Sequence, residues 1–395
     1  MTDHADPGDG REAPAARRIT LVGPAHPYKG GGARHTTELA HRLRDLGHEA
    51  GIESWRAQYP AALYPGQQTI TDPEGEPFPR TRHELAWYRP DGWWRTGRRL
   101  AGESDLVVLT LFSPVQVPAY LGILAGIRSL VRGGGRSGDR NGGAGPRVVV
   151  LCHNVLPHER RAIDVCLVRA LLRRVDGVLT HSAEQGRLAE GLLGPGAPAP
   201  VVAEMPPHLP DTGGVRSDEH TGECRSLLFF GIVRPYKGVD VLLRALAEGA
   251  PEDVTLTVAG EFWGGYGDLA ALAGELGLGD RVRFREGYVP ADELPELLAG
   301  ADALVLPYRS ATATQNVWLA HEHGLPVIAT RAGTLADHVR EGVDGLLCEP
   351  GDAADLARAL RAFYRPGEPA RLREGARPVD AEPYWKAYTD RLLGT

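Results

Sequence analysis

In the second half of the chain, short apolar runs alternate regularly with amphipathic segments. Apolar runs of strand length occur at residues 227–233, 254–259, 281–285, 303–306 and 326–330. Segments with helical periodicity separate them near residues 239–248, 269–276, 291–299 and 316–323. This alternation predicts an α/β domain in which helices cover both faces of a parallel sheet.

The first half of the chain repeats the pattern. Its predicted strands are residues 18–22, 49–54, 105–111, 147–151, 177–180 and 199–204. We therefore expect two Rossmann-like, doubly wound domains that face each other across a cleft. The expected boundaries are a disordered leader (1–16), a first domain (17–204) with a flexible glycine-rich loop (133–146), a linker (205–224), a second domain (225–376), and a C-terminal helix (377–395) that packs back on the first domain.

Composition excludes several classes of protein. With 395 residues and 42% hydrophobic content, the chain is long enough for two cores, and its net charge of −7 argues against a nucleic-acid partner. The four cysteines form no Cys-x-x-Cys pair, which indicates a reduced protein without a thiolate metal site. No apolar run approaches the roughly 20 residues that span a bilayer. We expect a cytoplasmic protein, soluble or at most peripheral at the inner membrane face.

A short basic turn is the first candidate site. Residues 229–240 read Phe-Phe-Gly-Ile-Val-Arg-Pro-Tyr-Lys-Gly-Val-Asp, which predicts a strand, a tight turn and a helix start. A helix start offers unpaired N–H groups and a positive dipole end, and Arg234 and Lys237 add two cations. This combination favours a phosphate or diphosphate ligand. The alternative is a surface turn with two solvated charges.

Two further segments carry candidate residues in the first domain. Gly30, Gly31 and Gly32 stand between a predicted strand and a helix, where a backbone without side chains can approach a ligand. Their spacing is not Gly-x-Gly-x-x-Gly, so a dinucleotide site is disfavoured, and a flexible loop is the alternative. His153 and Asn154 follow an apolar strand, at the end where doubly wound sheets bind ligands, although a packed or capping histidine is also possible there.

Aromatic and basic residues alternate between residues 59 and 99. Trp87, Tyr88, Trp93 and Trp94 are interleaved with arginines, a mixture that suits a membrane surface or an anionic lipid head. The alternative interpretation, which we favour, is an irregular segment that packs on the domain.

Five segments in order resemble one family, namely residues 22–32 (Val-Gly-Pro-Ala-His-Pro-Tyr-Lys-Gly-Gly-Gly), 153–159, 230–240, 324–330 (Gly-Leu-Pro-Val-Ile-Ala-Thr) and 341–347. The resemblance is to the retaining family 4 glycosyltransferases (glycosyl transferases group 1) of GT-B fold, and it extends over residues 18–364. It implies an enzyme, a hexosyltransferase, that takes a nucleotide sugar as co-substrate and a hydroxyl acceptor.

The resemblance also implies roles for individual residues. Arg234 and Lys237 would hold the donor diphosphate, the backbone of residues 30–32 would close over it, and His153 would lie against the donor sugar and its phosphate, beside Asn154. Backbone near Tyr288 and Val289 would meet the nucleobase.

One departure from the family pattern concerns two glutamates, whose positions are occupied here by Ala311 and Leu319. A subgroup with a Ser-Ala-Thr-Gln loop is similar to this chain, and there Thr314, Gln315 and Asn316 would hold phosphate or sugar. Glu322 is a candidate for the ribose contact, although a solvated helix-end glutamate is the alternative.

No Asp-x-Asp pair occurs in the chain, so we expect no obligatory metal and no cofactor. The resemblance implies same-face attack, in which a donor phosphate oxygen accepts the acceptor's proton. The acceptor would be a glycan, a lipid-linked intermediate or a metabolite. Two other hypotheses are a catalytically silent nucleotide-sugar-binding subunit of a partner transferase and, more remotely, an epimerase on the same architecture.

Overall fold

The computed structural model describes residues 15–60, 67–73, 75–133, 145–157, 161–209, 225–312 and 314–395. Parts of several predicted segments fall outside this range. They include residues 1–14 of the expected disordered leader, 61–66 and 74 of the segment 59–99, 134–144 of the expected glycine-rich loop, 158–159 of the segment 153–159, and 210–224 of the expected linker.

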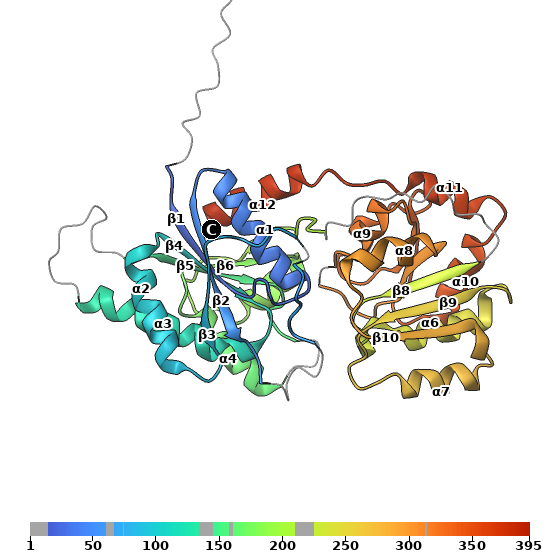
Figure 1. Ribbon diagram of the computed structural model, residues 1–395, viewed down its shortest axis with the longest axis horizontal. Coiled ribbons are helices and arrows are strands. Elements are labelled where there is room, and N and C mark those ends of the chain that lie inside the picture. Colours follow the sequence, from blue (N-terminus) through green and yellow to red (C-terminus); the bar gives the residue numbers. More distant parts are fainter. Residues whose placement is uncertain are drawn as a thin grey trace, which may run out of the picture.

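The chain forms two α/β units, each built around a sheet (Figure 1). The first sheet has seven parallel strands in the order β3-β2-β1-β4-β5-β6-β7. β4 and β5 are almost entirely buried and apolar, as expected for central strands that helices cover on both faces. The strands are β1 (Arg18–Val22), β2 (Glu49–Ala57), β3 (Thr81–Ala86), β4 (Leu106–Leu111), β5 (Arg147–Cys152), β6 (Gly177–Thr180) and β7 (Val201–Val202). The helices are α1 (Gly31–Asp45), α2 (Pro90–Glu103), α3 (Val117–Gly133), α4 (Ala162–Leu172) and α5 (Ala183–Glu190).

The second sheet has six parallel strands in the order β10-β9-β8-β11-β12-β13. The prediction of two doubly wound parallel sheets is confirmed. The strands are β8 (Ser226–Phe230), β9 (Thr255–Gly260), β10 (Val282–Glu286), β11 (Ala303–Leu306), β12 (Val327–Thr330) and β13 (Gly345–Cys348). The helices are α6 (Val239–Gly249), α7 (Gly267–Glu275), α8 (Leu294–Ala299), α9 (Asn316–Glu322), α10 (Ala353–Phe363) and α11 (Glu368–Gly375).

The expectation of an irregular segment at residues 59–99 is wrong for its second half. β3 pairs with β2 at the edge of the sheet, and α2 packs against α3. The two helices approach closely because glycines face each other. A Cβ on Gly97 would lie 2.0 Å from the carbonyl oxygen of Ile123, and one on Gly126 would lie 2.2 Å from that of Trp94.

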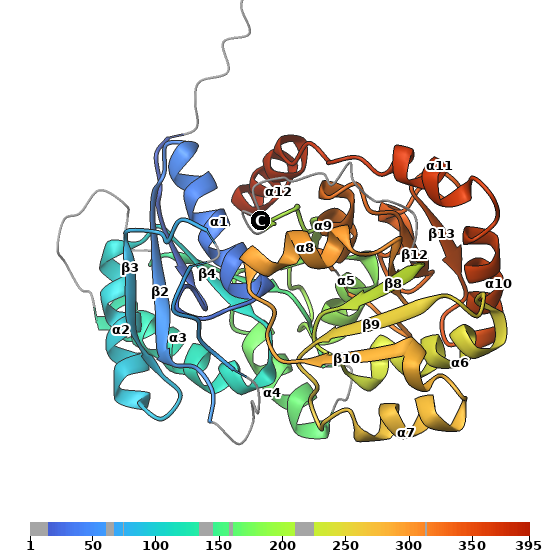
Figure 2. The ribbon, with the colours of Figure 1, turned by 45° about the vertical axis from the view of Figure 1, so that its right-hand side comes forward.

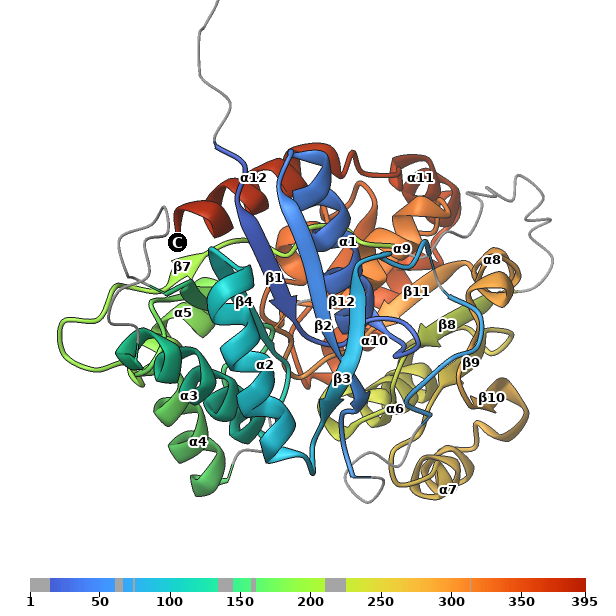
Figure 3. The ribbon, with the colours of Figure 1, turned by 60° about the vertical axis from the view of Figure 1, so that its left-hand side comes forward.

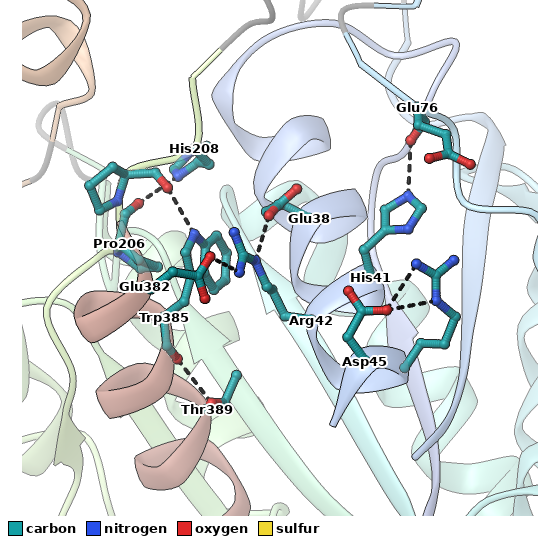
Figure 4. Close-up of polar contacts among 12 residues, drawn as sticks. Glu38, His41, Arg42, Asp45, Glu76, Pro206, His208, Glu382, Trp385 and Thr389 are labelled. Carbon is teal, nitrogen blue, oxygen red and sulfur yellow. Dashed lines mark hydrogen bonds and ion pairs between the residues drawn. The ribbon is translucent and has the colours of Figure 1, made fainter. Parts of the chain in front are cut away.

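The last helix, α12 (Glu382–Gly394), lies beside α1 and β1 of the first domain (Figures 2 and 3). Trp385, Tyr388 and Leu392 are buried in the same hydrophobic cluster as residues of β1 and α1. Arg42 of α1 bonds Glu382, and the indole N–H of Trp385 donates to the carbonyl of Pro207 at 2.9 Å (Figure 4). The end of the chain therefore joins the core of its first domain.

Within the part of the chain that the structure describes, no helix combines the length and the apolar character needed to cross a membrane.

Candidate functional site

A cavity of about 420 Å³ lies between the two sheets. Its walls come from the segments that follow β1, β4 and β5 in the first domain and β8 to β11 in the second. These are the carboxyl ends of the strands, where doubly wound sheets bind ligands. Of the predicted site residues, those that line the cavity are Gly30, Gly31, Gly32, His153, Asn154, Lys237, Tyr288, Val289, Thr314, Gln315 and Asn316.

Two predicted site residues are not part of this lining. The guanidinium of Arg234 lies 4.7 Å from the centre of the Trp263 ring. Glu322 ends α9, nearly one helical turn beyond Leu319, and it is Leu319 that faces the cavity. The suggested ribose contact of Glu322 therefore gains no support from the geometry, and the diphosphate contact of Arg234 stays a prediction.

The basic turn after β8 is held in place by the segment after β11. Gly238 has a positive φ of 68°, and a Cβ at this position would lie 2.0 Å from the carbonyl oxygen of Pro307. Arg309 forms two hydrogen bonds of 2.7 Å with the carboxylate of Asp240, and its backbone N–H donates to the carbonyl of Tyr236 at 2.7 Å. These contacts hold the turn in place and so fix the backbone position of Lys237.

Lys237 points its ammonium at the Tyr308 ring, 3.9 Å from the ring centre. Asn316 supports that ring, because its amide donates to the Tyr308 hydroxyl at 3.3 Å and to the carbonyl of Phe230 at 2.8 Å. Burial lowers the pKa of Lys237. No carboxylate of the described residues forms an ion pair with it. An anion bound in the cavity would relieve this cost of desolvation.

A second cation joins the two domains across the cavity. The ammonium of Lys29, just before the three glycines, lies 2.6 Å from Oε1 of Glu261, which follows β9. The side chains of the pair are only 5% and 11% exposed. The same ammonium lies 4.3 Å from the centre of the Tyr288 ring, and the backbone N–H of Gln67 donates to the same Oε1 at 3.0 Å.

His153 belongs to a buried cluster of four histidines, with His35, His181 and His208. The centre of the His35 ring lies 4.8 Å from the ring centre of His153, 5.9 Å from that of His181 and 5.1 Å from that of His208. Burial lowers the pKa of every member, to about 4 for His181 and about 3 for His208. His153 is thus a neutral imidazole at pH 7, and its Nε2 has no hydrogen-bond partner among the described residues.

Gln315 has a structural contact that the sequence did not predict. Its side-chain oxygen accepts a hydrogen bond of 2.9 Å from the backbone N–H of His208, and its amide lies 3.4 Å from the carbonyl oxygen of Pro206. The side chain therefore ties the segment that leaves the first domain to the second domain. Its predicted contact with the donor would compete with these bonds.

Sequence reasoning missed several residues of the lining, among them Lys29, Arg34, Phe112, His208 and Glu261. The ring of Phe112 stacks on His153 with 4.0 Å between ring centres. Phe112 and Glu261 directly follow β4 and β9. Both therefore lie at the carboxyl ends of parallel strands, the same kind of position that points to His153.

Comparison with known proteins finds sequence similarity to glycosyltransferases, mainly in the second domain. Residues 224–365 match the family model described as "Glycosyl transferases group 1". This match covers most of the second domain. A curated relative, D-inositol 3-phosphate glycosyltransferase 1 of Catenulispora acidiphila, is 36% identical over 180 residues, 42% of each chain. The enzyme named D-inositol 3-phosphate glycosyltransferase in Nocardia farcinica is 30% identical over 226 residues, 53% of this chain and 49% of its own.

Solved structures show the same fold over nearly the whole chain. HepE of Anabaena, in complex with UDP and glucose, has a TM-score of 0.69 at 18% identity, with 96% of this chain and 100% of HepE covered. Sucrose-phosphate synthase of Thermosynechococcus elongatus has a TM-score of 0.65 at 17% identity, with 96% and 97% covered. The expected GT-B fold is confirmed. The chain spans about two fifths of the length of the first curated relatives that it matches.

Proposed function

We propose that this protein is a glycosyltransferase that moves a sugar from a nucleotide-sugar donor to an acceptor hydroxyl with retention of configuration. The observation that carries the proposal is the interdomain cavity, which holds a half-buried lysine, a neutral histidine and a glycine loop at the ends of two doubly wound sheets. The family match of residues 224–365 supports a donor site in the second domain. The Ser-Ala-Thr-Gln subgroup stays a prediction.

The charge of the cavity suits a diphosphate. Lys29, Arg34 and Lys237 bring three cations to the lining, and Glu261 is the one carboxylate that the described residues bring to it. Lys29 is paired with Glu261, and among the described residues no carboxylate forms an ion pair with Lys237, so the charge of Lys237 is left to meet an anion. We propose that these groups offset the charge of the donor without an obligatory metal or a cofactor.

In the proposed mechanism, the site mainly stabilises the leaving group. Negative charge develops on the nucleoside diphosphate as the bond to the sugar breaks, and the ammonium of Lys237 and the N–H groups at the start of α1 would stabilise it. The neutral ring of His153, which lines the cavity, would orient the sugar and its phosphate. The acceptor hydroxyl would attack the sugar on the same face from which the leaving group departs. Its proton would pass to an oxygen of the donor phosphate.

The acceptor is proposed to bind the first domain, and a lipid-linked acceptor is one form of this proposal. Trp87, Tyr88 and Trp94 are exposed by 42%, 51% and 40%, and the guanidinium of Arg98 lies 4.8 Å from the centre of the Trp94 ring. Such a surface suits peripheral contact with an anionic membrane. Sedimentation with anionic vesicles should be stronger than with neutral ones, and Trp94→Ser should weaken it.

The test of the proposed function begins with thermal shifts of the pure protein in UDP, GDP, ADP, TDP and their common sugars, without added metal. A ligand at about a hundred times its dissociation constant adds roughly 2.7 kcal/mol of stability. With the donor so identified, Lys237→Ala should lower turnover about 100- to 1,000-fold, as the loss of one transition-state donor does elsewhere. Lys386→Ala, an exposed lysine paired with Asp390, is the matched control.

Unchanged turnover in Lys237→Ala, in a protein that melts like the wild type, would refute the proposed role of Lys237. Binding of a nucleotide sugar without any turnover would favour the silent-subunit hypothesis. A panel without a single shift would contradict the nucleotide site itself.

A further inference from the structure

Glu261 is a carboxylate in the cavity lining that the other domain holds in place. Among the described residues, no other carboxylate contributes to the lining. Its Oε1 accepts the ammonium of Lys29 at 2.6 Å and the backbone N–H of Gln67 at 3.0 Å, both from the first domain. No described residue donates a hydrogen bond to its Oε2. The side chain is thus fixed and charged, with acceptor capacity left over.

The order of the strands places Glu261 between two predicted parts of the donor site. β9 lies between β8 and β10 in the sheet. The basic turn with Lys237 follows β8, and the loop with Tyr288 and Val289 follows β10. Neighbouring strands are about 4.8 Å apart, so the three loops meet a ligand in that order. In a nucleoside diphosphate the ribose stands between the diphosphate and the base.

The chemistry of a ribose fits the chemistry of Glu261. The 2′ and 3′ hydroxyls form a vicinal diol, which presents two donors side by side. An ionised carboxylate accepts hydrogen bonds only, and at two oxygens. A charged acceptor that is already oriented by Lys29 loses little freedom when the diol binds.

We propose that Glu261 binds the ribose diol of the donor, so that the site selects ribonucleoside diphosphate sugars over their 2′-deoxy counterparts. Lys29 and Gln67 are positioning groups, which hold the carboxylate from the other domain. This inference rests on the proposed function, because it assumes a nucleoside diphosphate in the cavity. It predicts that TDP, whose sugar is a 2′-deoxyribose, is the poorest ligand of the panel.

The experiment is titration calorimetry with matched pairs, UDP and 2′-deoxy-UDP, GDP and 2′-deoxy-GDP, ADP and 2′-deoxy-ADP. Wild-type protein should bind the ribose form of its preferred nucleotide about 10- to 100-fold more tightly, the range for a hydrogen bond to a charged group. Glu261→Gln should reduce this ratio to about threefold or less. Glu286→Gln is the matched control, since Glu286 ends β10, is exposed and lies outside the cavity lining.

The outcomes separate this inference from the function on which it rests. Equal binding of ribose and deoxyribose forms by the wild type would overturn the inference alone, and this comparison needs no variant that must fold. A ratio that Glu261→Gln leaves unchanged would also overturn it, because the selectivity would then come from another group. Absence of binding by every diphosphate would overturn both the inference and the proposed function.

Discussion

Acidification should destabilise this protein through its four buried histidines. Burial lowers the pKa of His35, His153, His181 and His208 in the folded state, whereas in the unfolded chain each titrates near its ordinary value of 6.5. Below pH 6.5 the unfolded chain therefore binds protons that the folded protein does not. The stability that neutral burial contributes is present above pH 6.5 and is lost as the pH falls towards the folded values.

The size of the effect follows from the two members with defined values. The pKa is about 4 for His181 and about 3 for His208, so both stay mainly neutral in the folded protein at pH 4.5. Each histidine costs about 1.4 kcal/mol per pH unit in this range. Between pH 6.5 and 4.5 the two together should lower the free energy of unfolding by roughly 5 kcal/mol. Folded proteins are typically stable by about 5–15 kcal/mol, so a loss of this size removes a third or more of that stability.

The assay is urea unfolding at pH 7.5 and at pH 4.5, in the wild type and in His181→Asn. The asparagine amide can replace the ring Nδ1, which lies 3.2 Å from the carbonyl oxygen of Ala203, but it does not titrate. On going to pH 4.5 the variant should lose about 2 to 3 kcal/mol less than the wild type. His41→Gln, outside the cluster and able to keep its bond to the Glu76 carbonyl, is the control. Equal losses in His181→Asn and the wild type would show that neutral His181 contributes nothing to the pH dependence of stability.

Two further predictions concern the frame of the site. Gly238→Ala should destabilise the fold far more than Gly342→Ala, although both glycines have φ near 70°, because a Cβ clashes with Pro307 only at position 238. The alanine at position 342 should cost about 1 to 2 kcal/mol of stability. Equal melting temperatures of the two variants would contradict this prediction. Asn316→Asp should cost about 2 to 3 kcal/mol and weaken nucleotide binding, since it turns a donor to the carbonyl of Phe230 into an acceptor, and unaltered urea curves would argue against it.

The glycine and histidine positions of the site could be predicted because they follow strands that the sequence displays clearly. The strand at residues 18–22 has the expected bounds, and the strand before His153 extends one residue further than expected. Once such strands are assumed to be parallel, their carboxyl ends must share an edge. Gly30 and His153 therefore meet in one cavity although more than a hundred residues separate them.

Edge strands and close helix contacts were less visible in the sequence. β3 carries Arg82, His83 and Glu84 in succession, all exposed, because an edge strand tolerates charges on both sides. Its neighbour α2 has a mixed composition, and its contact with α3 depends on Gly97, a residue that weakens any prediction of a helix. An edge strand and a glycine-containing helix together resemble an irregular segment.

The surroundings of Glu261 could not be predicted from the sequence. Its neighbour Gly260 ends β9 and its neighbour Phe262 forms a bridge with Val233. The partner that fixes its carboxylate, Lys29, lies 232 positions away in the other domain. Only the strand order places it between Lys237 and the Tyr288 loop. A ligand that bonds Glu261 contacts a group which both domains already share. The affinity of that ligand must therefore depend on how closely the two domains approach each other, as well as on the residues that line the cavity.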